Sequence, residues 1–414
     1  MNMREMKDSG IEWIADIPEH WSVSKIGGLY SLRVTKVSDR DYPPLSVTNK
    51  GILPQLETAA KTNAHDDRKL VCKGDFAINS RSDRRGSCGI SSYTGSVSLI
   101  NTILRPMTEM HPQYYDWLFH TIQFGDEFYK WGHGIVDDLW TTGWQDMKKI
   151  SIPTPPITEQ AVIADFLDEQ CAEIDTLVTD IQSQIEALEE YKRSVITEAV
   201  TKGLDPDVEM RDSGVQWIGM MPTHWDCQRG KYILRYVQKP VRDDDGVITC
   251  FRDGEVTLRS NRREEGFTMA DKEIGYQGID VGDLVVHGMD GFAGAIGISD
   301  SRGKASPVLN VLDTEQNKRY IMYYLRSMAY NDVFVALATG IRVRSCDLRW
   351  NKLAELLYPM PTIEEQQAIV EHIDSVLERT NAIISDKKQQ VETIEEYKKS
   401  LIFEYVTGKK EVIV

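Results

Sequence analysis

The sequence predicts an α+β protein made of two tandem α/β domains, each followed by one long helix. The two helices are expected to pair as an intramolecular antiparallel coiled coil, which gives the chain a pseudo-twofold plan. Three observations support this prediction. Blocks from the first half of the 414-residue chain recur in the second half. The stretches between the blocks mix strand-like and helix-like patterns, and a run of heptads follows each of them.

One block opens each half of the chain. MKDSGIEWIADIPEHW (Met6 to Trp21) and MRDSGVQWIGMMPTHW (Met210 to Trp225) share nine of sixteen positions at an offset of 204. The residue types favour a structural segment, because Asp and Ser start turns, Gly reverses the chain, and Trp and Pro pack against a domain. We therefore interpret the block as the place where a globular domain joins the rest of the protein, and not as a site of chemistry.

Further blocks repeat at offsets of 206 to 208. The matched pairs are PTPPITEQAVI with PMPTIEEQQAI (153–163 and 359–369), IEALEEYKRSVITEAVT with VETIEEYKKSLIFEYVT (185–201 and 391–407), KGDFAINSRSDRRGSCGIS with VGDLVVHGMDGFAGAIGIS (73–91 and 281–299), and GIVDDLWTTGW with GIRVRSCDLRW (134–144 and 340–350). Because the offsets drift by only a few residues, the two halves are two copies of one plan.

Each globular part combines two secondary-structure patterns. Short apolar runs bounded by Gly and Asp, such as Leu70–Asn79 and Gly282–Gly288, predict strands. Tyr114–Phe124 and Arg319–Tyr330 have the apolar spacing of amphipathic helices. Four segments follow from the repeats and these patterns. They are an N-terminal globular domain at 1–152, a central helical region at 153–209, a C-terminal globular domain at 210–358 and a C-terminal helical region at 359–414.

A helix of about 45 residues, or about 65–70 Å, is predicted after each proline-rich stop. Apolar side chains recur in both helices with the spacing of a coiled-coil seam, and Thr380 and Lys387 interrupt the second stripe. The predicted seam residues are Leu167, Ile174, Ile181, Leu188 and Val195, with Ile163, Leu177, Ile185 and Tyr191 beside them, and in the second helix Ile373, Leu377, Ile384, Val391, Ile394 and Leu401. One helix cannot bury such a stripe alone, so we expect the two helices to pair within the chain. Pairing with helices of other chains is the alternative.

The composition indicates a soluble, folded protein of a reducing cytoplasm. No stretch approaches the apolar length of a membrane span, and residues 1–10 are too polar for a secretory signal. The six cysteines lie far apart, and no histidine stands at metal-ligand spacing from them. We therefore expect neither a disulfide framework nor a metal site.

The formal net charge of -16 at first argues against nucleic acid as a partner. Much of the acidity, however, lies in the predicted helices. Ile157–Gly203 carries a net charge of -8, whereas Ser22–Ile152 carries +2 and Asp226–Leu357 is neutral. The globular parts can therefore still present a basic face.

Motifs of known enzymes are missing from the sequence. It has no G-x-x-x-x-G-K-[ST] phosphate-binding loop and no [DNS]-P-P-[YF] motif of base-amino methylation. The triplets Glu190–Lys192 and Glu396–Lys398 resemble a fragment of a nuclease motif, but they lie in the predicted helices without an acidic partner on a strand. We expect no catalytic residues in this chain.

Two pairs of equivalent loops are candidates for contacts with DNA bases. SRSDRRGS (Ser80–Ser87) aligns with HGMDGFAG (His287–Gly294), and IVDDLW (Ile135–Trp140) aligns with IRVRSCD (Ile341–Asp347), so the frame is shared while the side chains differ. The planar fork of Arg can bond both acceptors of a guanine edge, and Asp can accept from a cytosine amino group. The predicted DNA-binding residues are Arg81, Asp83, Arg84, Arg85, Trp140, His287, Asp290, Arg342 and Arg344.

The alternative for any one of these arginines is an ordinary surface ion pair. The same alternative applies to Arg259, Arg262 and Arg263, which lie among neighbouring acidic residues.

The blocks together resemble those of the specificity subunits (HsdS family) of type I DNA restriction-modification systems, over essentially the whole chain. The segments that carry the resemblance are DSGIEWIADIPEHW and DSGVQWIGMMPTHW, IPTPPITEQ and YPMPTIEEQ, and EEYKRSVITEAVTKG and EEYKKSLIFEYVTGK. The resemblance implies two target-recognition domains, each of which binds one half of a split site in double-stranded DNA. It also implies that the helical regions form an antiparallel pair.

The resemblance further implies two methyltransferase (M) subunits and two restriction/translocase (R) subunits as partners. No cofactor is then expected on this chain, because S-adenosylmethionine belongs to the methyltransferase partner, and ATP and Mg²⁺ belong to the nuclease partner. The helix pair would set the number of base pairs between the half-sites and dock the methyltransferase subunits. A self-sufficient DNA methyltransferase and a purely architectural coiled-coil protein are the two alternatives.

Overall fold

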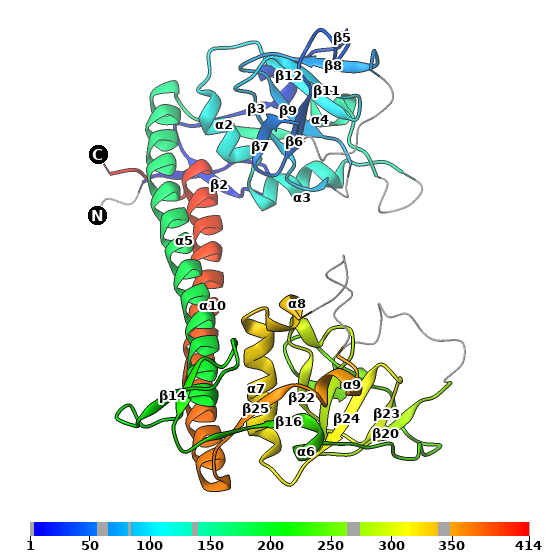
Figure 1. Cartoon of the computed structure of the whole chain (residues 1–414). Coiled ribbons are helices and arrows are strands. Elements are labelled where there is room, and N and C mark those ends of the chain that lie inside the picture. Colours follow the sequence, from blue (N-terminus) through cyan, green and yellow to red (C-terminus); the bar gives the residue numbers. More distant parts are fainter. Residues whose placement is uncertain are drawn as a thin grey trace. The chain divides into compact units, whose positions relative to one another are not determined.

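The computed structural model describes residues 4–55, 65–81, 84–134, 140–262, 274–337 and 348–413. The chain forms two compact units (Figure 1). Unit 1 consists of Met1–Gln182 together with Lys388–Val414, and unit 2 consists of Ser183–Lys387. Both long helices, α5 (Ile157–Lys202) and α10 (Ile363–Val406), are therefore shared between the units.

The globular part of unit 1 is a layered arrangement of strands and helices. Its principal strands are β4 (Tyr30–Leu32), β5 (Lys36–Val37), β6 (Leu45–Thr48), β7 (Gly51–Pro54), β8 (Arg68–Val71), β9 (Phe76–Asn79), β10 (Cys88–Ile90), β11 (Gly95–Ser98) and β12 (Asn101–Pro106). They form a four-stranded antiparallel sheet in the order β10-β9-β12-β4, a three-stranded sheet in the order β11-β8-β5, and the β6–β7 hairpin.

The two faces of the four-stranded sheet belong to different cores. Phe76 and Ile78 of β9 pack with aromatic residues of the helices α2 (Pro112–Phe119) and α3 (Ile122–Lys130). Ala77, between them, packs instead with Leu45 and Ile52 of the β6–β7 hairpin. Successive side chains of a strand point to opposite faces, so this short apolar strand is buried on both sides.

Smaller elements connect the sheet to the long helices of unit 1. They are the pair β1 (Met6–Asp8) and β2 (Asp16–Pro18), the pair β3 (Ser22–Lys25) and β13 (Ser151–Thr154), and the single turns of helix α1 (Ile26–Leu29) and α4 (Trp144–Met147). Because β13 leads directly into α5, the β3–β13 pair fixes the start of the globular chain beside the start of that helix.

Although no strand of its described residues corresponds to β5, unit 2 repeats the main elements of unit 1 in the same order. They are β14 (Met210–Asp212), β15 (Met220–Pro222), β16 (Asp226–Arg229), α6 (Gly230–Ile233), β17 (Arg235–Tyr236), β18 (Ile248–Cys250), β19 (Val256–Leu258), η3 (Arg259–Asn261), β20 (Gln277–Ile279), β21 (Leu284–His287), η4 (Gly291–Ala293), β22 (Ile296–Ile298), β23 (Gly303–Ala305), β24 (Leu309–Asp313), α7 (Lys318–Tyr330), α8 (Val333–Ala336), α9 (Trp350–Leu353) and β25 (Leu357–Met360). The central sheet has the order β17-β24-β21-β22, which matches β4-β12-β9-β10 of unit 1. The duplication of the sequence is therefore a duplication of the fold.

Within unit 1, the first part of α5 packs antiparallel to the last part of α10. The rings of Phe166 and Tyr405 lie 4.5 Å apart. Further along α5, Asp175 accepts a hydrogen bond of 2.6 Å from Lys398, which precedes Tyr405 on α10. Later residues of α5 therefore contact earlier residues of α10, so the two helices run antiparallel.

Unit 2 pairs the remaining parts of the same helices (Figure 1). Val200 near the end of α5 shares a core with Ile369 and Ile373 near the start of α10. Lys387, later on α10, donates a hydrogen bond of 2.6 Å to Gln184, which is earlier on α5. The predicted mixture of strands and helices and the predicted packing of the two long helices within one chain are both confirmed.

On α5, some of the residues that face α10 are not the ones predicted. Leu167, Ile174, Ile181, Leu188 and Val195 are buried or half-buried. The shielded residues that alternate with them, at steps of four and three, are Cys171, Val178, Ile185 and Lys192. On α10, Leu377 and Val391 are half-buried, and Ile384 and Leu401 are buried.

Leu177 and Tyr191, which were predicted beside the seam, are 48% and 51% exposed, so that part of the prediction was wrong. The seven-residue repeat of α5 allows two alternative sets of positions beside the main stripe. The set that contains Leu177 and Tyr191 would also bury Gln170 and Gln184. The set that the structure buries has three apolar side chains and only one charged residue, Lys192.

Two local predictions also changed in detail. Leu70–Asn79 is two strands, β8 and β9, joined by a turn in which Gly74 has a φ of +88°. Tyr114–Phe124 is two helices, α2 and α3, because Thr121 begins a new helix and its hydroxyl accepts from the Phe124 amide. Among the helices of the described residues, none is long and apolar enough to span a bilayer.

Candidate nucleic-acid interface

The repeated opening block is tied to the first turn of a long helix by one carboxylate in each unit. In unit 1, Glu159 of α5 accepts hydrogen bonds from the indole of Trp21, at 2.9 Å, and from the ring of His20. Burial raises the pKa of Glu159, but these hydrogen bonds and one from Arg4 lower it overall. The same contacts recur in unit 2, where Glu365 of α10 accepts from Trp225 at 3.4 Å and pairs with His224 at 2.7 Å. The block therefore has a structural role in both units.

Equivalent tyrosines hold the C-terminal ends of the long helices. The buried hydroxyl of Tyr114 donates to the carbonyl of Val406 at 2.7 Å in unit 1. In unit 2 the hydroxyl of Tyr320 is shared between the carbonyls of Pro359, at 2.9 Å, and Val200, at 3.2 Å. Carbonyls in the last turn of a helix lack partners within the helix. These contacts satisfy such carbonyls and fix each globular part against a helix end.

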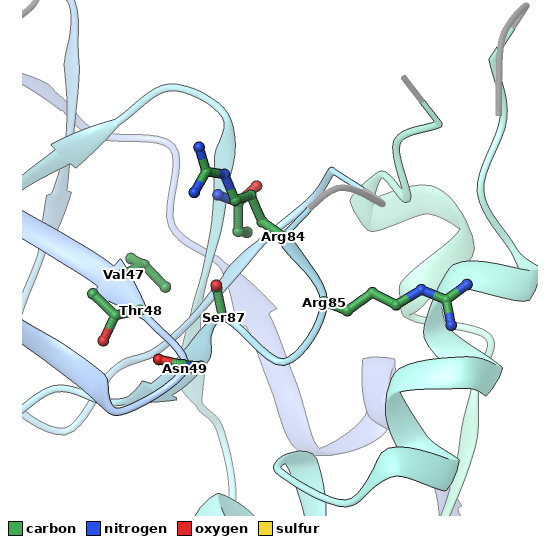
Figure 2. Close-up of a pocket in the computed structure, with 7 residues that line it drawn as sticks. Val47, Thr48, Asn49, Arg84, Arg85 and Ser87 are labelled. Atoms are coloured by element: carbon green, nitrogen blue, oxygen red, sulfur yellow. The ribbon is translucent and has the colours of Figure 1, made fainter. Parts of the chain in front are cut away.

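The loop that follows β9 carries Arg84 and Arg85, whose side chains extend in opposite directions (Figure 2). The guanidinium of Arg85 donates to Asp126 of α3 at 2.7 Å and lies over the ring of Tyr129, 5.4 Å from its centroid. Arg85 therefore has the surface ion pair that was the alternative for these arginines, although 64% of its side chain remains exposed.

Arg84 extends on the side of the β6–β7 hairpin and lines a depression of about 530 Å³ (Figure 2). The depression is lined by Val47, Thr48, Asn49, Asn79, Arg84, Arg85 and Ser87. Amide, hydroxyl and guanidinium groups together supply donors and acceptors of the kind that contact base edges and phosphates. The sequence blocks did not single out this hairpin, whose two-residue loop is Asn49-Lys50 between Thr48 and Gly51.

The equivalent loop of unit 2 places other side chains on the same backbone frame. The turn brings His287 and Asp290 together, because Nδ1 of His287 accepts from the Asp290 amide at 2.9 Å. Burial lowers the pKa of His287. The Asp290 carboxylate accepts from Arg252 at 2.8 Å. Arg252, which the sequence did not single out, is therefore the third member of this group.

In both units, one backbone hydrogen bond joins the first candidate loop to the chain that follows the second. Thr142 donates to the carbonyl of Ser80 at 2.9 Å, and Leu348 donates to the carbonyl of Gly288 at 2.8 Å. Arg81 is exposed and forms an isolated backbone bridge with Thr141, next to the half-buried Trp140. The structure thus brings Arg81 and Trp140 to one region of unit 1.

Three predicted DNA-binding residues, Asp83, Arg342 and Arg344, lie outside the described residues. Within the described ranges, no group of three or more His, Cys, Asp or Glu side chains is placed to hold a metal ion.

Comparison with known proteins shows which proteins this chain is similar to. No family model matches it. It is 23% identical over 422 residues to the type I restriction enzyme MjaVIII specificity subunit of Methanocaldococcus jannaschii, which covers 95% of this chain and 93% of that protein. The chain is a homologue of type I restriction enzyme specificity subunits. This chain is also 22% identical over 272 residues to the putative type I restriction enzyme MjaX specificity subunit of the same organism. That match covers 64% of this chain and 60% of that protein.

Two solved structures have the same fold as this chain. A chain solved in work on complex assembly and conformational transition of the type I R-M system matches with a TM-score of 0.70 and 11% identity, over 95% of this chain and 99% of that chain. The crystal structure of the HsdS subunit from Thermoanaerobacter tengcongensis matches with a TM-score of 0.51 and 12% identity, over 95% and 98%. The resemblance drawn from the sequence blocks is thereby confirmed.

Proposed function

We propose that this homologue is the DNA-binding specificity subunit of a type I restriction-modification complex, and that each unit binds one half of a bipartite site in double-stranded DNA. The equivalence of the candidate loops carries the proposal. Ser80 and Arg84–Ser87 follow β9, and Gly288–Gly294 follow β21, so they lie at equivalent places of two equivalent sheets and present different side chains. Base pairs are distinguished by their patterns of donors and acceptors, so two copies of one frame with different side chains suit two different half-sites.

Arg81 and Arg84 are the proposed base-contacting residues of unit 1. The fork of an arginine matches the O6 and N7 acceptors of guanine. Arg85, which is exposed on the same loop, is proposed to contact a phosphate. In unit 2, the pair of Arg252 and Asp290 offers a donor and an acceptor at the equivalent loop.

The helix pair is the proposed spacer between the half-sites and the docking surface for the methyltransferase subunits. Apolar side chains stay exposed at equivalent positions of the two helices, in the pairs Ile157 and Ile363, Leu177 and Ile383, and Tyr191 and Tyr397. Exposed apolar groups that recur on a surface are typical of interaction sites. Because the repeat presents each of them twice, they support the docking of two copies of one partner.

In this proposal the chain selects the sequence, and its partners carry the chemistry. Two methyltransferase subunits hold S-adenosylmethionine and methylate adenine, and two restriction/translocase subunits hold ATP and Mg²⁺ and cleave DNA. This chain itself binds no cofactor and supplies no catalytic residue.

The test is to map methylated adenines across the source genome with and without this gene. A gapped motif that disappears on deletion is the expected result, and it gives both half-sites at once. An unchanged methylome, together with failure of the chain to retain a methyltransferase in a pull-down, would contradict the proposal. Incubation of the purified chain with DNA and labelled S-adenosylmethionine separates it from a self-sufficient methyltransferase, which would transfer the label without a partner.

A further inference from the structure

A cavity of about 950 Å³ lies in unit 2, between the second part of α5, the helix α7 and the loop that holds η4. Two arginines from different elements converge on one aromatic ring in its wall. The guanidinium carbons of Arg193 on α5 and Arg326 on α7 lie 5.5 Å and 5.7 Å from the centroid of Tyr330. Arg326 is held in place, since it donates to the Tyr330 hydroxyl at 2.9 Å and to the Asp253 carbonyl at 2.7 Å.

Cationic side chains outnumber acidic ones in the lining of this cavity. The lining cations are Lys192, Arg193, Arg252 and Arg326, and the lining carboxylates are Glu189, Asp253 and Asp332. Glu189 pairs with Lys192 at 2.8 Å, Asp253 pairs with Arg262, and Arg252 pairs with Asp290. The remaining charged groups of the lining are Arg193, Arg326 and Asp332. Asp332 is exposed. Arg193 is also exposed, and its contact with the Tyr330 ring leaves the guanidinium donors available to an anion.

The cavity adjoins the candidate DNA-contacting loop of unit 2. Phe292 and Ala293 of that loop line it, and Arg252 reaches from its wall to Asp290 of the same loop. An anion bound between Arg193 and Arg326 would therefore stand beside the DNA half-site that this loop contacts.

We propose that Arg193 and Arg326 bind a phosphate of the DNA backbone next to the half-site of unit 2. This inference rests on the proposed function. Arginine forks match phosphate oxygens, and phosphate contacts fix the register of a protein on the duplex without reading its sequence. Because Arg193 belongs to α5, the contact couples the helix pair directly to the position of the DNA.

Unit 1 does not repeat the cluster at the equivalent positions. Arg193 corresponds to Lys399, which pairs with Glu396 at 3.1 Å. Arg326 corresponds to His120, whose Nδ1 donates to the Asp116 carbonyl at 2.7 Å, and Tyr330 corresponds to the buried Phe124. The phosphate contact is therefore a property of unit 2, and Lys399 offers a matched control on the other helix.

The test measures DNA binding by the full-length chain, co-purified with its methyltransferase partner, at several salt concentrations. The probes are a duplex that carries the gapped motif from the methylation map and an unrelated duplex of equal length. For Arg193→Ala we expect affinity for both duplexes to fall by the same factor, about tenfold. The slope of log affinity against log salt should become shallower by about 0.9, the value for one lost phosphate contact. Lys399→Ala should change neither quantity.

Arg326→Lys keeps the charge but loses the two hydrogen bonds that hold Arg326 in place, and should also weaken both duplexes equally. Thermal unfolding of each variant separates a loss of folding from a loss of binding. Unchanged affinity and salt slope for Arg193→Ala would overturn the phosphate site, and so would a loss confined to the motif duplex, which would make Arg193 a base contact. If the wild-type complex showed no preference for the motif duplex, the proposed function would fail, while the salt slopes would still decide the phosphate site.

Discussion

The hydroxyl of Tyr114 donates a hydrogen bond of 2.7 Å to the carbonyl of Val406, across 292 residues of sequence. One end of α10 is thereby fixed to α2, in the globular part of unit 1. Tyr320 makes the corresponding contact with Val200 at the end of α5 in unit 2, and shares it with the carbonyl of Pro359. Each globular part is thus held to its helices by a contact that closes a long stretch of chain, and the stability of the frame should depend on it.

Tyr114→Phe is expected to lower the free energy of unfolding by about 1–3 kcal/mol, because it leaves the buried carbonyl of Val406 without this donor. Urea unfolding followed by circular dichroism measures the change. Tyr30→Phe is the matched control, since the Tyr30 hydroxyl is also buried and has no hydrogen-bond partner among the described residues. Its removal should cost little or nothing. Equal losses in the two variants would show that the Tyr114 contact contributes no specific stability.

Arg84→Ala is expected to relax base preference at one position of the first half-site and to leave the second half-site unchanged. The loss of one two-point contact with guanine costs about 1–3 kcal/mol of discrimination. Arg85→Ala, which removes the proposed phosphate contact, should weaken methylation without changing the motif. Methylation mapping in cells that carry each variant reports both half-sites. A uniform loss of methylation without a change of motif would reassign Arg84 to a phosphate contact.

Asp280 in unit 2 should make stability sensitive to acid. Hydrogen bonds from Lys239 and Arg302 lower its pKa from 3.8 to about 2. A carboxyl whose pKa is depressed in the folded state stabilises the fold above its ordinary pKa, and that contribution disappears as the pH falls towards 2. The difference in unfolding free energy between wild type and Asp280→Asn should therefore shrink between about pH 4 and pH 2. Urea unfolding at several pH values tests this, with Asp243→Asn at an exposed position as the control. A difference that stayed constant over this range would contradict the assignment.

The sequence predicted the duplicated fold because the two copies share the residues that build it. Trp21 and Trp225, with Glu159 and Glu365, make the same contacts in both units, so their repetition signalled a common frame. The exposed positions of Leu177 and Tyr191 were wrongly predicted, although the observed set of seam positions holds three apolar residues and theirs holds only two. Lys192, which pairs with Glu189, is the one charged residue in the observed set.

The sequence predicted which loops form the candidate site, but not which side chains contact one another there. The ion pair of Arg85 with Asp126 and that of Asp290 with Arg252 join residues 41 and 38 positions apart. Arg193 and Arg326 meet only because α5 packs beside α7 in unit 2. Such contacts depend on tertiary packing, and a local pattern in the sequence does not contain them.

Insertion of one heptad into both long helices should lengthen the gap in the DNA motif and leave both half-sites unchanged. Suitable places follow Gln182 in α5 and Lys387 in α10, where the compact units divide the chain. Seven residues preserve the alternation of seam positions and add about 10 Å of helix, or about three base pairs at about 3.4 Å each. The gap read from methylation mapping should grow by that amount. Insertion of three residues at the same places should abolish methylation, because it rotates the seam away from its partner. Altered half-sites with an unchanged gap would show that the helix pair does not set the spacing.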